Sequence, residues 1–178
     1  MTLRSIKPLA YAATLGALAI SAPAALAEGT KFTASADLQN PDGEQVGTVN
    51  LTQVPDGVLM AVMLEGLPEG THAFHIHETG KCEPPFKSAG GHFNPTEAEH
   101  GLLNEAGMHA GDLPNIVMPE GKLELQYFNP RVSLIEGNEN NLLDEDGAAI
   151  VIHRGADDYE SNPAGKAGKR IACGVLDG

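Results

Sequence analysis

Alternating apolar and polar residues run along most of this chain and predict β-strands. The two kinds alternate in residues 46–53, and a Pro-Asp-Gly turn separates this segment from a more apolar run at 58–64. A period of two is typical of a strand that buries one face, because successive side chains point to opposite sides of a sheet. The same criteria predict eight strands, at residues 32–38, 46–53, 58–64, 72–77, 122–128, 132–135, 148–153 and 171–176.

The predicted strands indicate an all-β protein. No segment has a convincing helical period of 3.6 residues. Strands separated by turn sequences are typical of a β-sandwich or a Greek-key barrel. Two connections stay long, residues 78–121 and 154–170, and such connections inside a compact domain are usually functional or disordered. We therefore expect an eight-stranded Greek-key barrel or sandwich with a long functional loop and a shorter loop before the last strand.

The first 27 residues have the features of a secretory signal peptide. Arg4 and Lys7 precede an apolar run over residues 9–20, and an Ala-Leu-Ala sequence that ends at Ala27 resembles a cleavage site. The apolar run is too short to be a membrane anchor, because it cannot span the roughly 30 Å of a bilayer's hydrocarbon core. We predict export, cleavage after Ala27 and a single mature domain over residues 28–178.

The charge of the chain limits its partners. The full sequence has 24 acidic and 11 basic residues, and two of the basic residues lie in the predicted signal peptide. The mature chain would then keep nine basic and 24 acidic residues, a net charge of −15 with neutral histidines. So negative a protein is not suited to bind nucleic acid or an anionic membrane surface. We expect neither kind of partner.

The two cysteines, Cys82 and Cys173, are an even pair in a chain predicted to be exported. An oxidising compartment favours a disulfide between them, whereas a cytosolic chain would keep free thiols or use a cysteine as a metal ligand. A bond across the 91 residues that separate them would tie the long loop to the last strand. In the chain-entropy model, a closure of this length stabilises the fold by about 4–5 kcal/mol.

Histidines are concentrated in one region, with six of the seven between residues 72 and 112. His75 and His77 lie two apart on a predicted strand, so their imidazoles share one face, about 7 Å apart along the chain. A single histidine is more often a surface or core residue than a ligand, but a cluster with an aspartate favours a metal site. Imidazoles and a carboxylate without cysteine suit ions such as copper and zinc. The candidate ligands in the long loop are His92, His100, His109 and Asp112.

His72 differs from these histidines. It lies an odd number of residues before His75 and His77, so on a continuous strand it would point to the opposite face. We expect a structural role for it, as a buried imidazole that hydrogen-bonds to backbone carbonyl groups.

Six motifs occur in order along the mature chain: His75-Ile76-His77, Gly91-His92-Phe93-Asn94-Pro95, His100-Gly101, His109-Ala110-Gly111-Asp112, Val151-Ile152-His153 and Gly168-Lys169-Arg170-Ile171-Ala172-Cys173-Gly174-Val175. Together they resemble the copper/zinc superoxide dismutases. They follow the same order as in that family and extend over nearly all of the mature chain. The neighbourhood of Cys82 and the export signal are more similar to the bacterial periplasmic branch than to the cytosolic eukaryotic one. The family fold is an eight-stranded Greek-key barrel, which agrees with the strand pattern.

The resemblance implies a site for two metals. His92 would bridge the two ions as a shared imidazolate, and Asp157 would orient one ligand of each ion from outside. As an alternative, Asp157 is an ordinary solvated loop residue. By resemblance, the copper ligands are His75, His77, His92 and His153, and the zinc ligands are His92, His100, His109 and Asp112.

The resemblance also implies the activity. Copper would take an electron from one superoxide anion, releasing oxygen, and give it to a second, which leaves as hydrogen peroxide. Arg170 would draw in the anion, and His92 would supply a proton; the alternative for Arg170 is a plain ion pair with an acid. The segment 154–169 is shorter than in the cytosolic eukaryotic branch, so the lysines that steer substrate there cannot be transferred to this chain.

Two other classes of function stay open from sequence. The chain could be a copper or zinc carrier, or an inactive dismutase-like domain, although the complete ligand set and Arg170 argue against both. It could also be a structural sandwich in which the histidines are coincidental. We expect a periplasmic location and name a homodimer as one possibility, since bacterial relatives use different surfaces and some are monomeric.

Overall fold

The computed structural model describes residues 32–178, so the predicted signal peptide at residues 1–27 lies outside the described part of the chain. The described residues contain nine strands and one 3-10 turn, η1 (Lys87–Ala89). No helix among them is long and apolar enough to cross a membrane. The strands are β1 (Thr33–Gln39), β2 (Gln45–Val54), β3 (Gly57–Glu65), β4 (Gly70–His72), β5 (Phe74–His77), β6 (Ile116–Met118), β7 (Lys122–Asn129), β8 (Ala149–His153) and β9 (Arg170–Val175).

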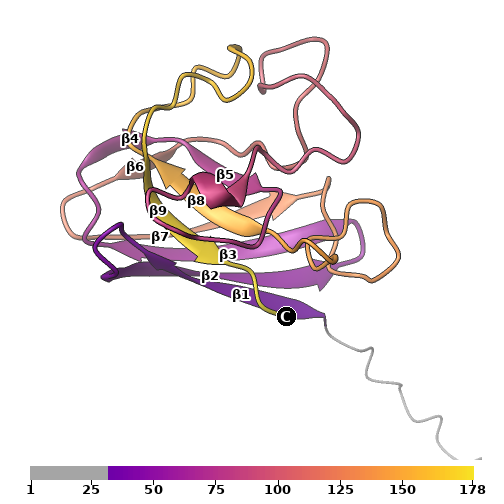
Figure 1. Cartoon of the computed structure of the whole chain (residues 1–178), viewed down its shortest axis with the longest axis horizontal. Helices are drawn as coiled ribbons and strands as arrows, with labels where there is room; N and C mark the ends of the chain where they lie inside the picture. Colours follow the sequence, from indigo (N-terminus) through magenta and orange to yellow (C-terminus); the bar gives the residue numbers. More distant parts are fainter. Residues whose placement is uncertain (1–31) are drawn as a thin grey trace, which may run out of the picture.

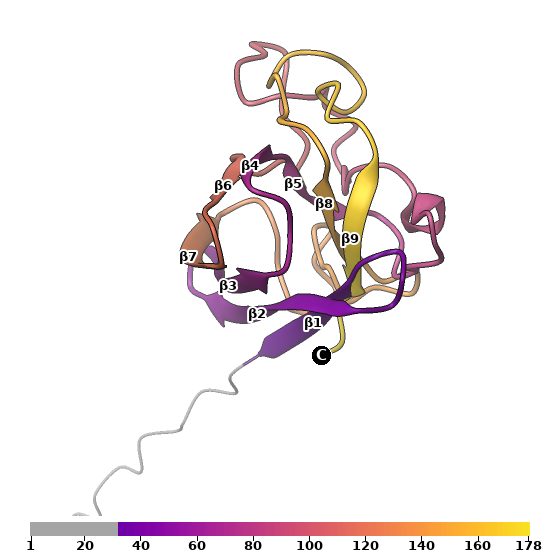
Figure 2. The same ribbon diagram turned by 90° about the vertical axis from the view of Figure 1, so that its left-hand side faces the viewer.

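Seven strands form one antiparallel sheet in the order β5-β8-β9-β1-β2-β3-β7. The sheet curls around the core, and the two-stranded ribbon of β4 and β6 lies between its two ends (Figure 2). The predicted all-β class is confirmed.

Strand patterning follows the position of each strand in the barrel. In β1 every second residue is buried, which is the alternation expected of a strand with one face on the core and one in solvent. In β8 all five residues are buried. Ile150 and Ile152 belong to the barrel core. Ala149 and Val151 pack on the outer face against the segment 82–89, called the disulfide loop below because Cys82 pairs with Cys173. β8 is therefore covered on both sides.

Three details of the predicted strands were wrong. Residues 132–135 form no strand; Val132 and Leu134 are buried in a loop, where the Leu134 N–H donates to the Gln53 side chain at 2.8 Å. The predicted strand 72–77 is divided at Ala73, whose N–H donates to Gly155 O at 2.8 Å rather than to a neighbouring strand. The sequence analysis missed β6, because three residues are too few to show an alternation.

The two long connections emerge at the same end of the barrel and lie against each other (Figure 1). The first runs from β5 to β6 and the second from β8 to β9. A disulfide between Cys82 and Cys173 ties the first connection to β9, which confirms the predicted pair. The first connection is thus attached to a strand of the sheet.

Candidate metal centre

Four imidazoles converge at the loop end of the barrel. His75 and His77 come from β5, His153 ends β8, and His92 follows in the long loop. The pairing of His75 with Val151 sets β5 beside β8. All four rings are buried, and one nitrogen from each lies within 4.8 Å of the others. The structure therefore brings the predicted copper ligands together.

The ring nitrogens that face one another carry no hydrogen. Each of His75 Nε2, His77 Nδ1 and His153 Nδ1 faces an oxygen that can only accept, so each of these nitrogens is the N–H donor. Their acceptors are Asp157 at 2.7 Å, the carbonyl of Gly90 at 3.1 Å and the carbonyl of Gly168 at 3.2 Å.

The other ring nitrogen of each of these three histidines is buried, as is Nε2 of His92. None of the four has a hydrogen-bond partner within residues 32–178. A buried polar atom without a partner costs roughly 1–3 kcal/mol, so four at one place require an explanation. Four converging lone pairs, each oriented by a partner on the other side of the ring, fit a metal ion. The unpaired nitrogens are His75 Nδ1, His77 Nε2, His92 Nε2 and His153 Nε2.

A second cluster surrounds Asp112. One carboxylate oxygen lies 2.7 Å from His92 Nδ1, 3.0 Å from His100 Nδ1 and 3.2 Å from His109 Nδ1. The other oxygen accepts the N–H groups of Gly101 and His109, at 2.9 and 3.0 Å, which fixes the carboxylate. Three histidines and one aspartate complete a four-coordinate shell without an open position, as in structural zinc sites.

His92 belongs to both clusters. Its Nδ1 faces Asp112, and its Nε2 is the unpaired atom that faces the first cluster. It is the single side chain shared by the two groups of candidate ligands in the described residues. One ring can therefore contact two ions, one on each nitrogen.

Asp157 links the two clusters from outside. Its carboxylate accepts from His75 Nε2 at 2.7 Å and lies 3.0 Å from His100 Nε2. Asn115 holds the backbone of Asp157 through a pair of amide hydrogen bonds of 2.8 and 2.9 Å. Gly165 leaves the room for the carboxylate, because a Cβ there would lie 1.8 Å from Asp157 Oδ1.

Asn115 and Gly165 were missed in the sequence analysis. Asn115 lies 42 residues from its partner, and a glycine in a polar loop gives no local signal of close packing.

His100 has a raised pKa, whereas the pKa values of His77, His92 and His153 are lowered. Burial disfavours the charged imidazole and lowers the pKa of His92 to about 4 and that of His153 to about 3; it also lowers the pKa of His77 well below its usual value. Burial acts in the same direction on His100, but the carboxylates of Asp112 and Asp157 outweigh it and raise the pKa of His100 to about 9. In the absence of ions, a proton on His100 therefore balances these acids at neutral pH.

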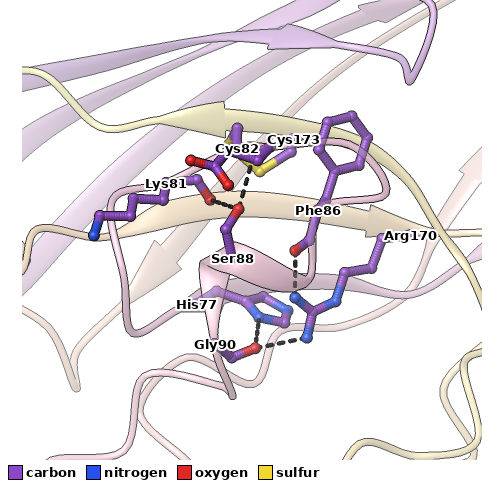
Figure 3. Close-up of a disulfide and its surroundings, with 9 residues drawn as sticks. His77, Lys81, Cys82, Phe86, Ser88, Gly90, Arg170 and Cys173 are labelled. Atoms are coloured by element: carbon purple, nitrogen blue, oxygen red, sulfur yellow. Dashed lines mark hydrogen bonds between the residues drawn. A yellow bond between two sulfur atoms is a disulfide. The ribbon is translucent and has the colours of Figure 1, made fainter.

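Arg170 lies next to the first cluster (Figure 3). It starts β9, and its Nη1 and Nη2 donate to the carbonyls of Phe86 at 2.5 Å and Gly90 at 2.6 Å. The Gly90 carbonyl also accepts from His77 Nδ1, so the arginine and a candidate metal ligand share one acceptor. A cavity of about 220 Å³ borders the cluster at His153; its lining residues are His153, Asn162, Pro163, Ala164, Lys166, Ala167 and Gly168.

His72 stands apart from both clusters. It is buried, with Nδ1 2.9 Å from the carbonyl of His153 and Nε2 2.8 Å from that of Pro68. It supports the backbone beneath a candidate ligand, in agreement with the structural role expected from the sequence.

Comparisons with known proteins agree with this geometry. The family model for copper/zinc superoxide dismutase matches residues 45–176. A superoxide dismutase [Cu-Zn] of Aquifex aeolicus is 54% identical over 79% of this chain and 85% of its own length. One from Caulobacter vibrioides is 44% identical over 81% of this chain and 85% of its own length.

A solved structure gives the same result for the fold. It is a superoxide dismutase-like protein from Bacillus subtilis, in a variant that replaces a tyrosine and a proline with histidine. Its TM-score is 0.78 at 45% identity, covering 81% of this chain and 97% of the other.

Zinc binding at neutral pH should release a proton from His100. Because the raised pKa keeps this imidazole protonated below about pH 9, zinc must displace that proton at pH 7 and 8. Apparent zinc affinity should therefore rise with pH and level off above about 9. Calorimetric titration of the metal-free protein in buffers of different ionisation enthalpy measures the proton count.

On binding zinc at pH 8, the variant Asp157→Asn should release fewer protons than wild type, because it lacks a carboxylate that raises the pKa of His100. Asp37→Asn, an exposed residue of β1, is the matched control. Zinc uptake without proton release at pH 7 would contradict the prediction that zinc displaces a proton from His100.

Proposed function

Because the chain belongs to the copper/zinc superoxide dismutase family, we propose that its two histidine clusters hold copper and zinc side by side and that His92 bridges them. As a member of this family the protein is an oxidoreductase that uses copper and zinc to convert superoxide to oxygen and hydrogen peroxide. The observation that carries the proposal is the set of four buried, unpaired nitrogens next to a closed cluster that shares one ring with them.

The donor atoms favour one assignment of the metals. Three histidines and Asp112 leave no open position, which suits a structural zinc ion. Four imidazoles suit copper, which when bound supplies the redox chemistry by accepting an electron from one superoxide and passing it to the next. The first cluster also borders the cavity at His153.

Arg170 would bind the anion. Its guanidinium uses Nη1 and Nη2 to reach backbone carbonyls and keeps further N–H donors. The positive charge also disfavours protonation of His77 and His153, although burial is the larger cause of their lowered pKa values. The same side chain would therefore attract superoxide and help to keep ligand nitrogens free of protons.

His92 would supply a proton to the departing peroxide. Its Nε2 is buried and unpaired on the side of the first cluster, while its Nδ1 stays beside Asp112. The reaction consumes two superoxide anions and two protons and yields oxygen and hydrogen peroxide. Nε2 is the atom that would hold the first of these protons, and solvent would provide the second.

Export to the periplasm is part of the proposal. It is supported by the signal-like sequence of residues 1–27 and by the Cys82–Cys173 disulfide, since such bonds persist in oxidising compartments. A homodimer stays a prediction. A metal carrier or an inactive domain is disfavoured because both ligand clusters are complete and Arg170 is in place.

The rate of superoxide decay should fall modestly with ionic strength. The acidic protein as a whole repels the anion. However, six of the eight basic residues in the described chain lie in or next to the disulfide loop, in the loop between β8 and β9, or at the first residue of β9. Superoxide dismutases are a known example of electrostatic steering, so membership of the family supports this direction. The six are Lys81, Lys87, Arg154, Lys166, Lys169 and Arg170.

Salt screens charges beyond about 10 Å at 0.1 M, so distant acids lose their effect before a local positive field does. Arg170→Glu should lose more activity than Arg170→Lys, and pulse radiolysis across a salt series measures both effects. A wild-type rate that climbs with salt would mean that the net negative charge dominates.

Asp112→Ala should weaken zinc binding and lower the melting temperature. Loss of a direct ligand should cost more than the roughly 10–100-fold in affinity that follows loss of an outer partner. The loop around His100 and His109 then loses its organising ion, while part of the copper chemistry near neutral pH survives. Metal competition and calorimetry measure the two losses, with Glu124→Ala on the exposed side of β7 as control. A variant that melts like wild type would disprove a structural role for this cluster.

A further inference from the structure

Phe86 has an unusual backbone conformation for a bulky residue. Its φ of 68° and ψ of 17° place it in the left-handed region, which residues other than glycine rarely adopt. It directly precedes η1 in the disulfide loop, and its side chain is only 2% exposed. A bulky residue held in this region indicates that its surroundings fix it there, and such residues are common near functional sites.

The conformation separates the ring from the carbonyl of the same residue (Figure 3). The ring packs with Ala149, Val151 and Cys173 in the small apolar cluster beneath the disulfide. The carbonyl oxygen points the other way and accepts from Arg170 Nη1 at 2.5 Å. Burial of the ring thus fixes the direction of an acceptor for the proposed anion-binding arginine.

The second acceptor of Arg170 depends on the same turn. Within η1 the N–H of Ala89 donates to Phe86 O at 3.3 Å, and that of Gly90 donates to Lys87 O at 3.2 Å. The turn ends at Gly90, whose carbonyl accepts from Arg170 Nη2 at 2.6 Å. Both acceptors therefore belong to one turn that begins at Phe86.

Other contacts also hold this loop. His77 Nδ1 donates to the Gly90 carbonyl at 3.1 Å, and the Thr79 N–H donates to the Ala89 carbonyl at 3.2 Å. Ser88 Oγ accepts the Glu83 N–H at 2.8 Å and donates to Lys81 O at 3.2 Å, which closes the segment next to the disulfide. These bonds hold the chain on the side of Cys82. Phe86 and Ala89 are the buried apolar side chains that tie the turn to β8 and β9, and the ring of Phe86 is the larger of the two.

We propose that Phe86 is a positioning residue for Arg170: its buried ring holds the left-handed turn whose two carbonyls fix the guanidinium beside the first histidine cluster. The inference deepens the proposed function and rests on it in taking Arg170 as the group that binds the anionic substrate. It assigns this task to a residue that touches neither the metals nor the substrate.

The first experiment measures the freedom of Arg170 without using activity. Phenylglyoxal reacts with accessible arginines, and mass spectrometry of the metal-loaded protein follows each site separately. Arg131 and Arg154 are exposed and serve as references in the same molecule. In Phe86→Ala, Arg170 should react several-fold faster with phenylglyoxal, while the two reference arginines keep their rates. Phe86→Leu keeps a large apolar side chain, so the rate of Arg170 should lie close to that of wild type.

Two further variants separate the ring from other causes. Phe86→Gly allows the left-handed backbone without strain but removes the ring, so it should behave like Phe86→Ala. Leu51→Ala removes a buried side chain of the main core on β2 and controls for general loss of stability. An Arg170 rate in Phe86→Gly equal to wild type, or an equal rise in Leu51→Ala, would overturn the proposal.

The second experiment tests the effect on anion binding. Azide titrated against the copper(II) form should bind several-fold more weakly to Phe86→Ala than to wild type, and Phe86→Leu should restore most of the affinity. If wild type removes superoxide but the Phe86 variants keep its azide affinity and Arg170 reactivity, the positioning role is wrong and the proposed function stands. If wild type lacks activity while Arg170 reactivity still rises in Phe86→Ala, the proposed function fails and the positioning role stands.

Discussion

The structure depends on the burial of six imidazoles and two carboxylates at one end of a small barrel. Buried polar groups cost free energy unless each has a partner, and charged ones cost more. The protein satisfies the outer nitrogens with carbonyl and carboxylate oxygens and leaves the inner ones facing one another. Two bound ions would satisfy the inner set, so folding of the loops and metal binding are coupled. The groups are His75, His77, His92, His100, His109, His153, Asp112 and Asp157.

The barrel makes this arrangement possible because it supplies rigid positions for the first ligands. β5 and β8 pair directly, which sets His75, His77 and His153 before any loop is placed. The loops are then attached at two separate points. Asp157, in the connection between β8 and β9, contacts His75 and His100, and the disulfide joins the connection between β5 and β6 to β9. The position of Arg170 follows from the second attachment, since both of its acceptors lie in the disulfide loop.

Sequence patterns predicted the parts of the structure that depend on local periodicity. The alternation in β1 and β2 and the shared face of His75 and His77 follow from a period of two, and the two rings lie 6.4 Å apart. The division of the ligands into two sets came from family resemblance and not from spacing. The roles of Asn115 and Phe86 could not be predicted, because their partners lie 42 and 84 residues away. The loop at 132–135, whose first three residues are buried, was misread as a strand because an apolar pattern reports burial as well as pairing.

Magnetic coupling between the two ions tests the central claim most directly. Cobalt(II) placed in the cluster of His100, His109 and Asp112 can be combined with copper(II) in the other cluster, and the magnetic susceptibility and EPR signal of the copper recorded. Because His92 offers one nitrogen to each cluster, the account predicts coupled spins and loss of the isolated copper signal. The copper signal should return when His92 is replaced by alanine. Independent copper and cobalt signals in the wild-type protein would contradict a shared imidazolate.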